Sequence, residues 1–239
     1  MERVIPMTRE EYLSKLYETY ARVAVLSDKE DSRVIRVRHR TLDRDMVVRS
    51  HPRPVAAYEV LYRLTCDNLP QIYDVVDLED GQVVLEEYID GLTVAQVMES
   101  GRYRPAGARR IVREVCRALT ALHGQRLIHR DIKPENLLID RNGRVVLIDF
   151  HAARPMAPPT GTTVALGTVG YASPEQYGLG ANDGRTDLYA VGVLYNVLLT
   201  GKHPSHTLAK GRAGRVIRRC TQINPVERYP SAEKLEKAI

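Results

Sequence analysis

Cysteine is scarce in this chain, and the placement of the few cysteines excludes two kinds of site. The 239 residues contain only Cys66, Cys116 and Cys220, which are far apart and odd in number. Their spacing fits neither a disulfide framework nor a zinc site. Cys66 and Cys116 fall in apolar, helix-like patterns, so we expect both to be small core residues. This use of cysteine fits a reducing compartment.

Long apolar runs are also missing. The first residues, MERVIPMTREEY, lack an apolar signal region, and no uninterrupted apolar run approaches the length of a membrane span. The net charge of +5 is mildly basic, and arginines occur in every segment. We interpret them as solvated surface and not as a nucleic-acid-binding stripe. The sequence therefore predicts a cytoplasmic protein with neither a membrane span nor a nucleic-acid partner.

One stretch, HRDIKPENLLIDRNGRVVLIDF at residues 129–150, carries the strongest pattern in the sequence. Residues 137–139 and 145–148 are apolar runs, and Asn142-Gly143 between them is a strong tight-turn signal. The stretch is therefore predicted to fold as a short β-hairpin. A hairpin of this length brings its two ends together.

Four polar side chains flank this hairpin and are expected to converge. Asp131, Lys133 and Asn136 precede it, and Asp149 follows it. Mg²⁺ prefers hard oxygen ligands such as Asn136 and Asp149. An attacking hydroxyl needs a base such as Asp131, and a moving phosphoryl group needs a cation such as Lys133. The set suits phosphoryl transfer.

The same stretch resembles the catalytic loop and metal-binding segment of eukaryotic-like protein kinases, whose signature HRDxKxxN is followed by Asp-Phe. The resemblance covers about residues 22–239, and GTVGYASPEQYG and TDLYAVG are similar to the bacterial branch of the family. It implies an α+β, bilobal protein-kinase fold with a β-rich N-lobe at 22–88 and a helical C-lobe at 89–239. Residues 1–21 would form a helical extension. Lys133 favours serine/threonine over tyrosine specificity.

The resemblance also assigns roles to other C-lobe residues. Asp187 would begin a buried central helix over residues 187–199 and bind the backbone of the catalytic loop. Glu175 would pair with Arg228. Thr168, in the substrate-binding tract at 167–175, would hydrogen-bond Asp131 and Lys133. The helix that normally follows the central helix is expected to be trimmed, because only KHPSHTLAKGRAG separates residues 201 and 215.

The N-terminal region reads as a helix and three strands. Thr8 and Glu11 form a capping box before apolar residues that fall on one helical face, Tyr12 to Tyr20. This helix is expected to pack across the N-lobe, although docking of a partner is an alternative. Strands are expected at residues 23–26, 34–37 and 46–48.

Glycine is absent where the family has a glycine-rich loop. The loop reads SDKEDSRV over residues 27–34 and places carboxylates where phosphates would lie. Arg49 stands in place of the phosphate-binding lysine, and Ala57 in place of its helical glutamate partner. His151 replaces the glycine that follows Asp-Phe and would restrict that segment.

The segment EEYIDG at residues 86–91 resembles the hinge between kinase lobes. By this match, Glu87 and Ile89 would offer backbone groups to adenine. Glu86 would occupy a position at the back of the pocket that is usually apolar. Alternatively, Glu86 pairs inward with Arg49 and replaces the missing helical glutamate.

These observations favour transfer of the γ-phosphoryl group of ATP, with Mg²⁺, to Ser/Thr hydroxyls of a protein substrate. The alternative is a pseudokinase that acts as a nucleotide- or partner-binding scaffold, which the altered N-lobe motifs favour. A small-molecule phosphotransferase of related fold is disfavoured by Lys133 and by the tract at 167–175. The sequence does not indicate an oligomeric state.

Overall fold

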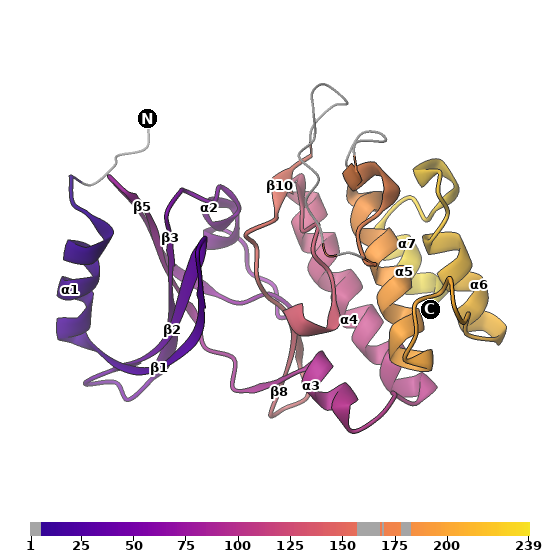
Figure 1. Cartoon of the computed structure of the whole chain (residues 1–239), viewed down its shortest axis with the longest axis horizontal. Helices are drawn as coiled ribbons and strands as arrows, with labels where there is room; N and C mark the ends of the chain where they lie inside the picture. The colour runs from indigo at the N-terminus through magenta and orange to yellow at the C-terminus, as the bar shows by residue number, and fades with distance from the viewer. Residues whose placement is uncertain (1–5, 157–167, 169, 178–182) are drawn as a thin grey trace. The chain divides into compact units, whose positions relative to one another are not determined.

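The computed structural model describes residues 6–156, 168, 170–177 and 183–239 (Figure 1). The chain divides into two compact units. Unit 1 consists of Met1–Thr65 and Pro70–Ile89, and unit 2 consists of Cys66–Leu69 and Asp90–Ile239.

Unit 1 is built on a five-stranded antiparallel sheet with the strand order β1-β2-β3-β5-β4. The predicted strands at 23–26, 34–37 and 46–48 are confirmed as the centres of longer strands. The elements of unit 1 are α1 (Arg9–Thr19), β1 (Tyr20–Lys29), β2 (Ser32–His39), β3 (Asp45–His51), α2 (Ala57–Tyr62), β4 (Ile72–Leu78) and β5 (Gly81–Glu87).

Helix α1 packs against one face of this sheet, as the sequence predicts. Thr8 and Glu11 form the expected capping box at its start. Tyr12, Leu13 and Leu16 pack on a buried cluster of strand residues. In Figure 1, α1 and α2 lie on opposite sides of the sheet. The cluster consists of Ile35, Val37, Met46, Val48, Val76, Leu78 and Val83.

The segment that replaces the glycine-rich loop forms a tight hairpin. Ser27 pairs with Val34 and Lys29 with Ser32, so that only residues 30 and 31 turn between β1 and β2. The carboxylate of Asp28 lies 3.5 Å from the Arg33 guanidinium on the paired strand. The backbone groups of this segment therefore pair between β1 and β2. In a glycine-rich loop, the backbone N–H groups would instead be open to phosphates.

Unit 2 is mainly helical. Its helices are α3 (Val94–Glu99), α4 (Pro105–Gly124), α5 (Gly184–Thr200), α6 (Gly211–Cys220) and α7 (Ala232–Ala238). Its short strands are β6 (Gly91–Thr93), β7 (Leu127–Ile128), β8 (Leu137–Asp140), β9 (Val145–Leu147) and β10 (Arg154–Pro155), and its 3₁₀ turns are η1 (Pro134–Asn136), η2 (Pro174–Tyr177) and η3 (Pro225–Glu227).

Helix α5 is the buried centre of unit 2. It begins after the N-cap Asp183 and ends at Gly201, whose φ of 72° is readily adopted by glycine. Leu188, Val193 and Leu198 on it are fully buried or nearly so. The connection at 201–210, which the structure describes in full, contains no helix before α6, as expected from the sequence.

The expectation that Cys66 is a helical core residue is wrong. Cys66 lies in an irregular segment after α2 and is half-buried, whereas Cys116 is a buried residue of α4 as predicted. The helix-like apolar pattern continues over residues 58–64, but α2 ends at Tyr62. The side chain of His123, near the end of α4, is only 13% exposed and lies against Asp187.

Candidate active site

The predicted hairpin at the centre of unit 2 is confirmed. Strands β8 and β9 pair antiparallel, and Gly143 in the turn has a φ of 83°. The backbone N–H of Ile148 donates to the carbonyl of Asn136 across 2.9 Å and ties the two ends together. The hairpin therefore brings the segment of Asp131 and Asn136 next to that of Asp149.

The backbone before Asp131 is held by Asp187 at the start of α5. Its carboxylate accepts from the backbone N–H of His129 at 2.9 Å and of Arg130 at 2.8 Å. This contact was expected from the resemblance and is confirmed. Arg130 has a φ of 69°, which is costly for a residue with a side chain. Two buried hydrogen bonds to Asp187 and one from Gln176 Nε2 to the Arg130 carbonyl, 2.9 Å, stabilise this conformation.

His129 is fully buried, and burial lowers its pKa. The neutral ring fits both of its contacts. Nδ1 accepts from the backbone N–H of Asp131 at 3.3 Å, and Nε2 lies 3.2 Å from the carbonyl of Ile148, to which it can donate. One imidazole therefore connects the catalytic loop to the strand that leads to Asp149.

Asp131 is the centre of a compact hydrogen-bonded cluster. Lys133 Nζ lies 2.7 Å from Asp131 Oδ2 and donates to Thr168 Oγ1 at 2.7 Å. The Thr168 hydroxyl donates to Asp131 Oδ1 at 2.6 Å. Asn136 Nδ2 donates to both the carbonyl and Oδ2 of Asp131, each at 2.8 Å. The expected bonds of Thr168 to Asp131 and Lys133 are confirmed.

The electrostatics of this cluster keep Asp131 ionised. Its burial acts to raise the pKa of the carboxyl group, but the hydrogen bonds from Lys133 and Thr168 outweigh it and leave the pKa below its usual value. An ionised, well-ordered carboxylate can accept a hydrogen bond from a hydroxyl group. The cluster can therefore orient an alcohol.

Asp149 follows β9 with a φ of 69°, a second strained position beside the hairpin. Its Oδ1 lies 2.9 Å from Nδ1 of His151, the residue at the family's glycine position. Within the described residues, no group of three or more His, Cys, Asp or Glu side chains could hold a metal ion. A cation beside Asp149 would therefore be bound by fewer than three side chains of these types.

Asn136 would supply one of the oxygens around this cation. Its Nδ2 donates to Asp131, so its amide oxygen Oδ1 would be the atom that contacts a cation. An amide oxygen and a carboxylate at Asp149 are hard donors of the kind Mg²⁺ takes when substrate phosphates complete its coordination. The residues present fit a divalent cation.

Glu175 and Arg228 form the predicted ion pair. The guanidinium donates to Glu175 Oε1 at 2.6 Å and to Oε2 at 2.9 Å, a bidentate pair with side chains 2% or less exposed. Arg228 also donates to the carbonyls of Arg185, Gln222 and Ile223. The pair therefore fixes η2 to α5 and to the segment before α7.

In unit 1, Arg49 pairs with Glu86. Arg49 Nε donates to Glu86 Oε1 at 2.6 Å, with the two side chains 9% and 4% exposed. Ala57, at the family's glutamate position, is the first residue of the six-residue helix α2 and is buried. The alternative in which Glu86 replaces the missing partner is confirmed.

The remaining predicted site residues lie at the end of unit 1 and in the tract at 167–175. Glu87 ends β5, and its backbone N–H donates to the Gln71 carbonyl at 2.8 Å. Ile89 is buried at the end of unit 1. In the tract at 167–175, residues 167 and 169 lie outside the described part of the chain, as do Pro158 and Pro159 of the preceding loop.

Sequence reasoning missed three residues that support the loop. His123 Nε2 lies 2.8 Å from Asp187 Oδ2, and Gln176 holds the Arg130 carbonyl. Arg130 itself is buried, and its Nε and Nη2 have no hydrogen-bond partner among the described residues. For His123 and Gln176 the partners are distant in sequence, which left no local signal.

No helix in the described ranges is long and apolar enough to cross a membrane.

Known proteins are similar to this chain in sequence. The sequence profile of the family described as "Protein kinase domain" matches residues 19–238. Serine/threonine-protein kinase PrkC of Bacillus subtilis is 30% identical over 198 residues, covering 72% of this chain and 31% of that protein. PknL of Mycobacterium tuberculosis is 42% identical over 147 residues, 59% of this chain and 36% of that protein.

PknB of Mycolicibacterium smegmatis is 34% identical over 160 residues, 65% of this chain and 24% of that kinase. The chain thus spans about a third or less of the length of these curated relatives. The family profile, in contrast, covers nearly all of the chain from β1 to α7. With the kinase-type hairpin and cluster in place, this match shows that the chain belongs to the protein kinase domain family.

Proposed function

We propose that this chain transfers the γ-phosphoryl group of ATP to Ser and Thr hydroxyls of protein substrates. The observation that carries the proposal is the cluster in which Lys133 and the Thr168 hydroxyl both contact the Asp131 carboxylate. The hydroxyl of Thr168 is the kind of donor that a substrate Ser or Thr offers. The names of the bacterial relatives, serine/threonine-protein kinases, support the same substrate class.

The proposed reaction assigns one task to each group. Asp131 orients the substrate hydroxyl and accepts its proton as the oxygen bonds to the γ-phosphorus. The bond from that phosphorus to the β–γ bridging oxygen breaks, and ADP leaves with the electron pair. Lys133 neutralises the negative charge of the group in transit. Thr168, between the two, keeps the carboxylate and the ammonium aligned.

Proteins of this family use ATP and a divalent metal ion, and we propose Mg²⁺ for this chain, held by Asn136 and Asp149. These two residues would place the positive charge of the ion beside the phosphates of ATP, where it would offset their negative charge. Unit 1 is proposed to contribute Arg49, Glu87 and Ile89 to ATP binding, on the resemblance alone. We also propose that residues 22–88 act as the N-lobe, residues 89–239 as the C-lobe, and residues 1–21 as an extension.

The compartment is proposed from the cysteines. Cys66, Cys116 and Cys220 are all free thiols, and two of them are buried. This state supports a reducing compartment, and hence a cytoplasmic position for the residues present here. Trapping of free thiols in intact cells, read by the mass added to each cysteine after denaturation, tests it.

The test of activity uses radiolabelled ATP, Mg²⁺ and casein as a general acceptor protein. Wild type is expected to give phosphoserine and phosphothreonine after acid hydrolysis. Asp131→Asn, nearly equal in volume, should lower incorporation by about a hundredfold or more, because it removes the proton acceptor. Asp43→Asn, at a side chain that is 84% exposed, is the matched control.

The same preparation separates the two leading hypotheses. A wild-type protein that is stabilised by ATP and Mg²⁺ and labels casein supports the proposal. A folded wild type that neither transfers phosphate nor is stabilised by ATP overturns it in favour of the scaffold. Equal labelling of casein by wild type and Asp131→Asn would show that Asp131 is not the proton acceptor and that other residues carry out the transfer.

A further inference from the structure

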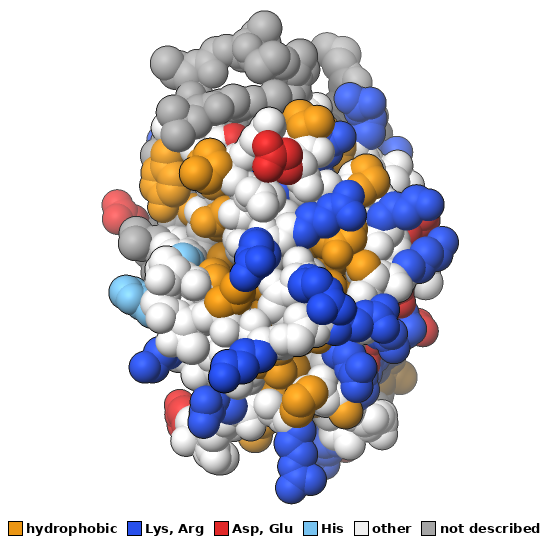
Figure 2. Space-filling model, turned by 90° about the vertical axis from the view of Figure 1, so that its right-hand side faces the viewer, with side chains coloured by type: hydrophobic (Ala, Val, Ile, Leu, Met, Phe, Trp, Pro, Cys, Tyr) orange, Lys and Arg blue, Asp and Glu red, His pale blue; other side chains and the backbone are white. Residues whose placement is uncertain are grey.

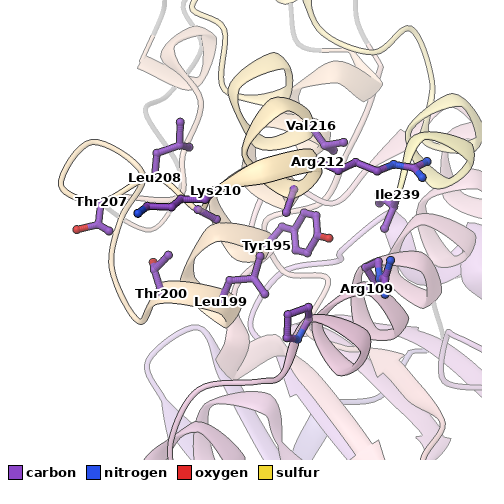
Figure 3. A pocket seen from close by; sticks show the side chains of 13 residues that line it. Arg109, Tyr195, Leu199, Thr200, Thr207, Leu208, Lys210, Arg212, Val216 and Ile239 are labelled. Carbon is purple, nitrogen blue, oxygen red and sulfur yellow. The ribbon is translucent and has the colours of Figure 1, made fainter.

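Unit 2 carries a groove of about 520 Å³ whose lining residues take no part in the proposed chemistry. It lies between the start of α4, the end of α5, the connection at 201–210 and the start of α6. In the close-up, Tyr195 stands at the centre, with Arg109 and Arg212 on one side and Lys210 on the other (Figure 3). Its size is that of a pocket which encloses a compact apolar group.

The wall of the groove is held in place by buried contacts. Asn196 on α5 is fully buried, donates to the carbonyls of Lys202 and Thr207 at 2.7 Å each, and accepts from the Ala209 N–H at 2.9 Å. Gly214 on α6 lies so close to the Ala209 carbonyl that an added Cβ would be 1.9 Å from its oxygen. The short connection is therefore fixed to both helices, which pre-organises the groove.

The lining combines an apolar floor with cations. Leu199, Leu208 and Val216 contribute aliphatic surface. Among the described residues that line the groove, Arg109, Lys210 and Arg212 are charged and none is acidic. Burial raises the pKa of Tyr195 at the centre, so its hydroxyl adds no negative charge. The groove is suited to an apolar group with negative charge beside it.

A second groove, of about 460 Å³, continues this surface along α4 and shares Arg109 with the first. Its charged lining residues are Arg109, Arg113 and Arg117, which are spaced four residues apart on one helical face, together with Arg110 and Glu114. Glu114 lies 3.5 Å from Arg110, and its side chain is only 13% exposed. Arg117 is paired with Glu236 at 2.9 Å, but the side chains of Arg109 and Arg113 make no hydrogen bond or ion pair with any described residue. Two free guanidinium groups thus extend the charge beyond the apolar groove.

The wider surface has the same character. The exposed residues of α6 include Arg212, Arg215, Arg218 and Arg219. On the face of unit 2 that carries α6, Lys and Arg side chains predominate over acidic ones, with apolar side chains between them (Figure 2). Positive charge in this arrangement attracts acidic partners at a distance.

From these features we infer that the two grooves form a docking site for an acidic peptide segment of a partner protein, with a bulky apolar residue as its anchor. The anchor occupies the groove of Leu199, Leu208 and Val216. The acidic residues then follow α4 along Arg109 and Arg113. Binding at this site does not depend on phosphotransfer.

The spacing of the cations favours a peptide over a ligand with a single charge. From Arg109 to Arg113, the two unpaired cations, the helix rises about 6 Å. That distance corresponds to about two residues of extended chain. A fatty acid would place one carboxylate against this row, whereas a peptide with consecutive acidic residues meets several cations at once. The apolar floor beside the row distinguishes it from a surface that contacts only a phosphate backbone.

The test measures fluorescence polarisation of a fluorescein-labelled peptide, Phe-Leu-Glu-Glu-Asp-Glu, with the whole chain and no nucleotide. Saturable binding is expected, and it should weaken as ionic strength rises past about 0.15 M, since surface charges are then screened. Arg109→Glu is expected to raise Kd by about tenfold or more. Leu208→Ala should weaken binding through the anchor. The charge-matched control is Arg215→Glu on α6, an exposed residue outside both linings, whose Kd should stay within about twofold of wild type.

Two altered peptides separate the halves of the site. Replacing the acids by Gln and Asn, or the Phe-Leu pair by Ser-Gly, should each abolish measurable binding. The proposal is overturned if neither change matters, if Arg109→Glu and Arg215→Glu act alike, or if the starting peptide does not bind. It is also overturned if an oligothymidine or phosphatidylglycerol vesicles bind Arg109-dependently and displace the peptide completely at lower concentrations. Circular dichroism of each variant checks that it is folded.

Discussion

Arg49 Nε donates to Glu86 Oε1 across 2.6 Å, and the two residues lie on neighbouring strands, β3 and β5, with both side chains buried. The family resemblance placed the partner of this cation on a helix, where this chain has Ala57. The pair is instead formed within the sheet. A strand residue of unit 1 therefore supplies a carboxylate to its buried cation.

This relationship predicts a strong, non-additive effect on stability. Arg49→Met or Glu86→Leu alone should lower the free energy of unfolding by about 3–5 kcal/mol, because each removes the opposite charge that lies 2.6 Å from a buried charge. Arg49→Met combined with Glu86→Leu, which removes both charges and keeps apolar volume, should cost much less. Urea unfolding followed by circular dichroism measures all of these. Losses that add strictly would mean that the two side chains do not depend on each other.

The C-lobe motifs could be predicted from the sequence because each is short and specific. HRDIKPEN and the turn at Asn142-Gly143 defined the hairpin, and with it the place of Asp149. The contacts of Thr168 and of Asp187 also followed from the resemblance. The hairpin is a short local pattern whose two ends must meet, whereas the contacts of Thr168 and Asp187 join distant residues and were expected only from the family motifs.

Contacts between distant segments with no motif were harder to predict. Arg49 and Glu86 are joined by the register of β3 with β5, in which Val47 lies opposite Glu86. Because the sequence does not reveal that register, pairing of Glu86 with Arg49 was only one of two alternatives for Glu86. His123 meets Asp187 across 64 positions, and nothing near His123 indicates a buried acid. Such pairs depend on tertiary packing, which local periodicity does not encode.

Asp149→Ala should abolish Mg²⁺-dependent binding of ATP. In the proposed site, this carboxylate would supply the negative charge that faces the ion, whereas Asn136 would supply only an amide oxygen. The measurement is the shift of the unfolding temperature by ATP, with Mg²⁺ and with EDTA. Asp67→Ala, which also removes one carboxylate but at an exposed position, is the control. A shift by ATP and Mg²⁺ that survives in Asp149→Ala contradicts the proposed metal site.

Acid should remove a stabilising contribution from Asp45. The hydrogen bond from Arg38, with further contributions from Arg36, lowers the pKa of Asp45 to about 2. An unfolded aspartate titrates near 3.9, so the contribution is complete above about pH 4 and is lost as the pH falls toward 2. Urea unfolding between these pH values should show a steeper loss for wild type than for Asp45→Asn. Asp43→Asn, at a side chain 84% exposed, should keep the wild-type slope, and equal slopes for all three would refute the assignment.

Glu175 and Arg228 offer the sharpest test of the C-lobe core. Arg228 makes a bidentate pair with Glu175 and also donates to three backbone carbonyls. Arg228→Ala should therefore cost more than Glu175→Ala, because it also leaves these carbonyls without their donor. Each single change should cost about 3 kcal/mol or more.

The double variant Glu175→Ala/Arg228→Ala should cost less than the sum of the two, with a coupling of about 1–3 kcal/mol. Urea unfolding of wild type, the two single variants and the double variant measures this coupling. Arg117→Ala and Glu236→Ala, at an exposed pair 2.9 Å apart, form the matched control cycle, with a coupling of about 1 kcal/mol or less. A larger coupling at the exposed pair than at the buried one would contradict this prediction, because exclusion of water is expected to strengthen the interaction within the buried pair.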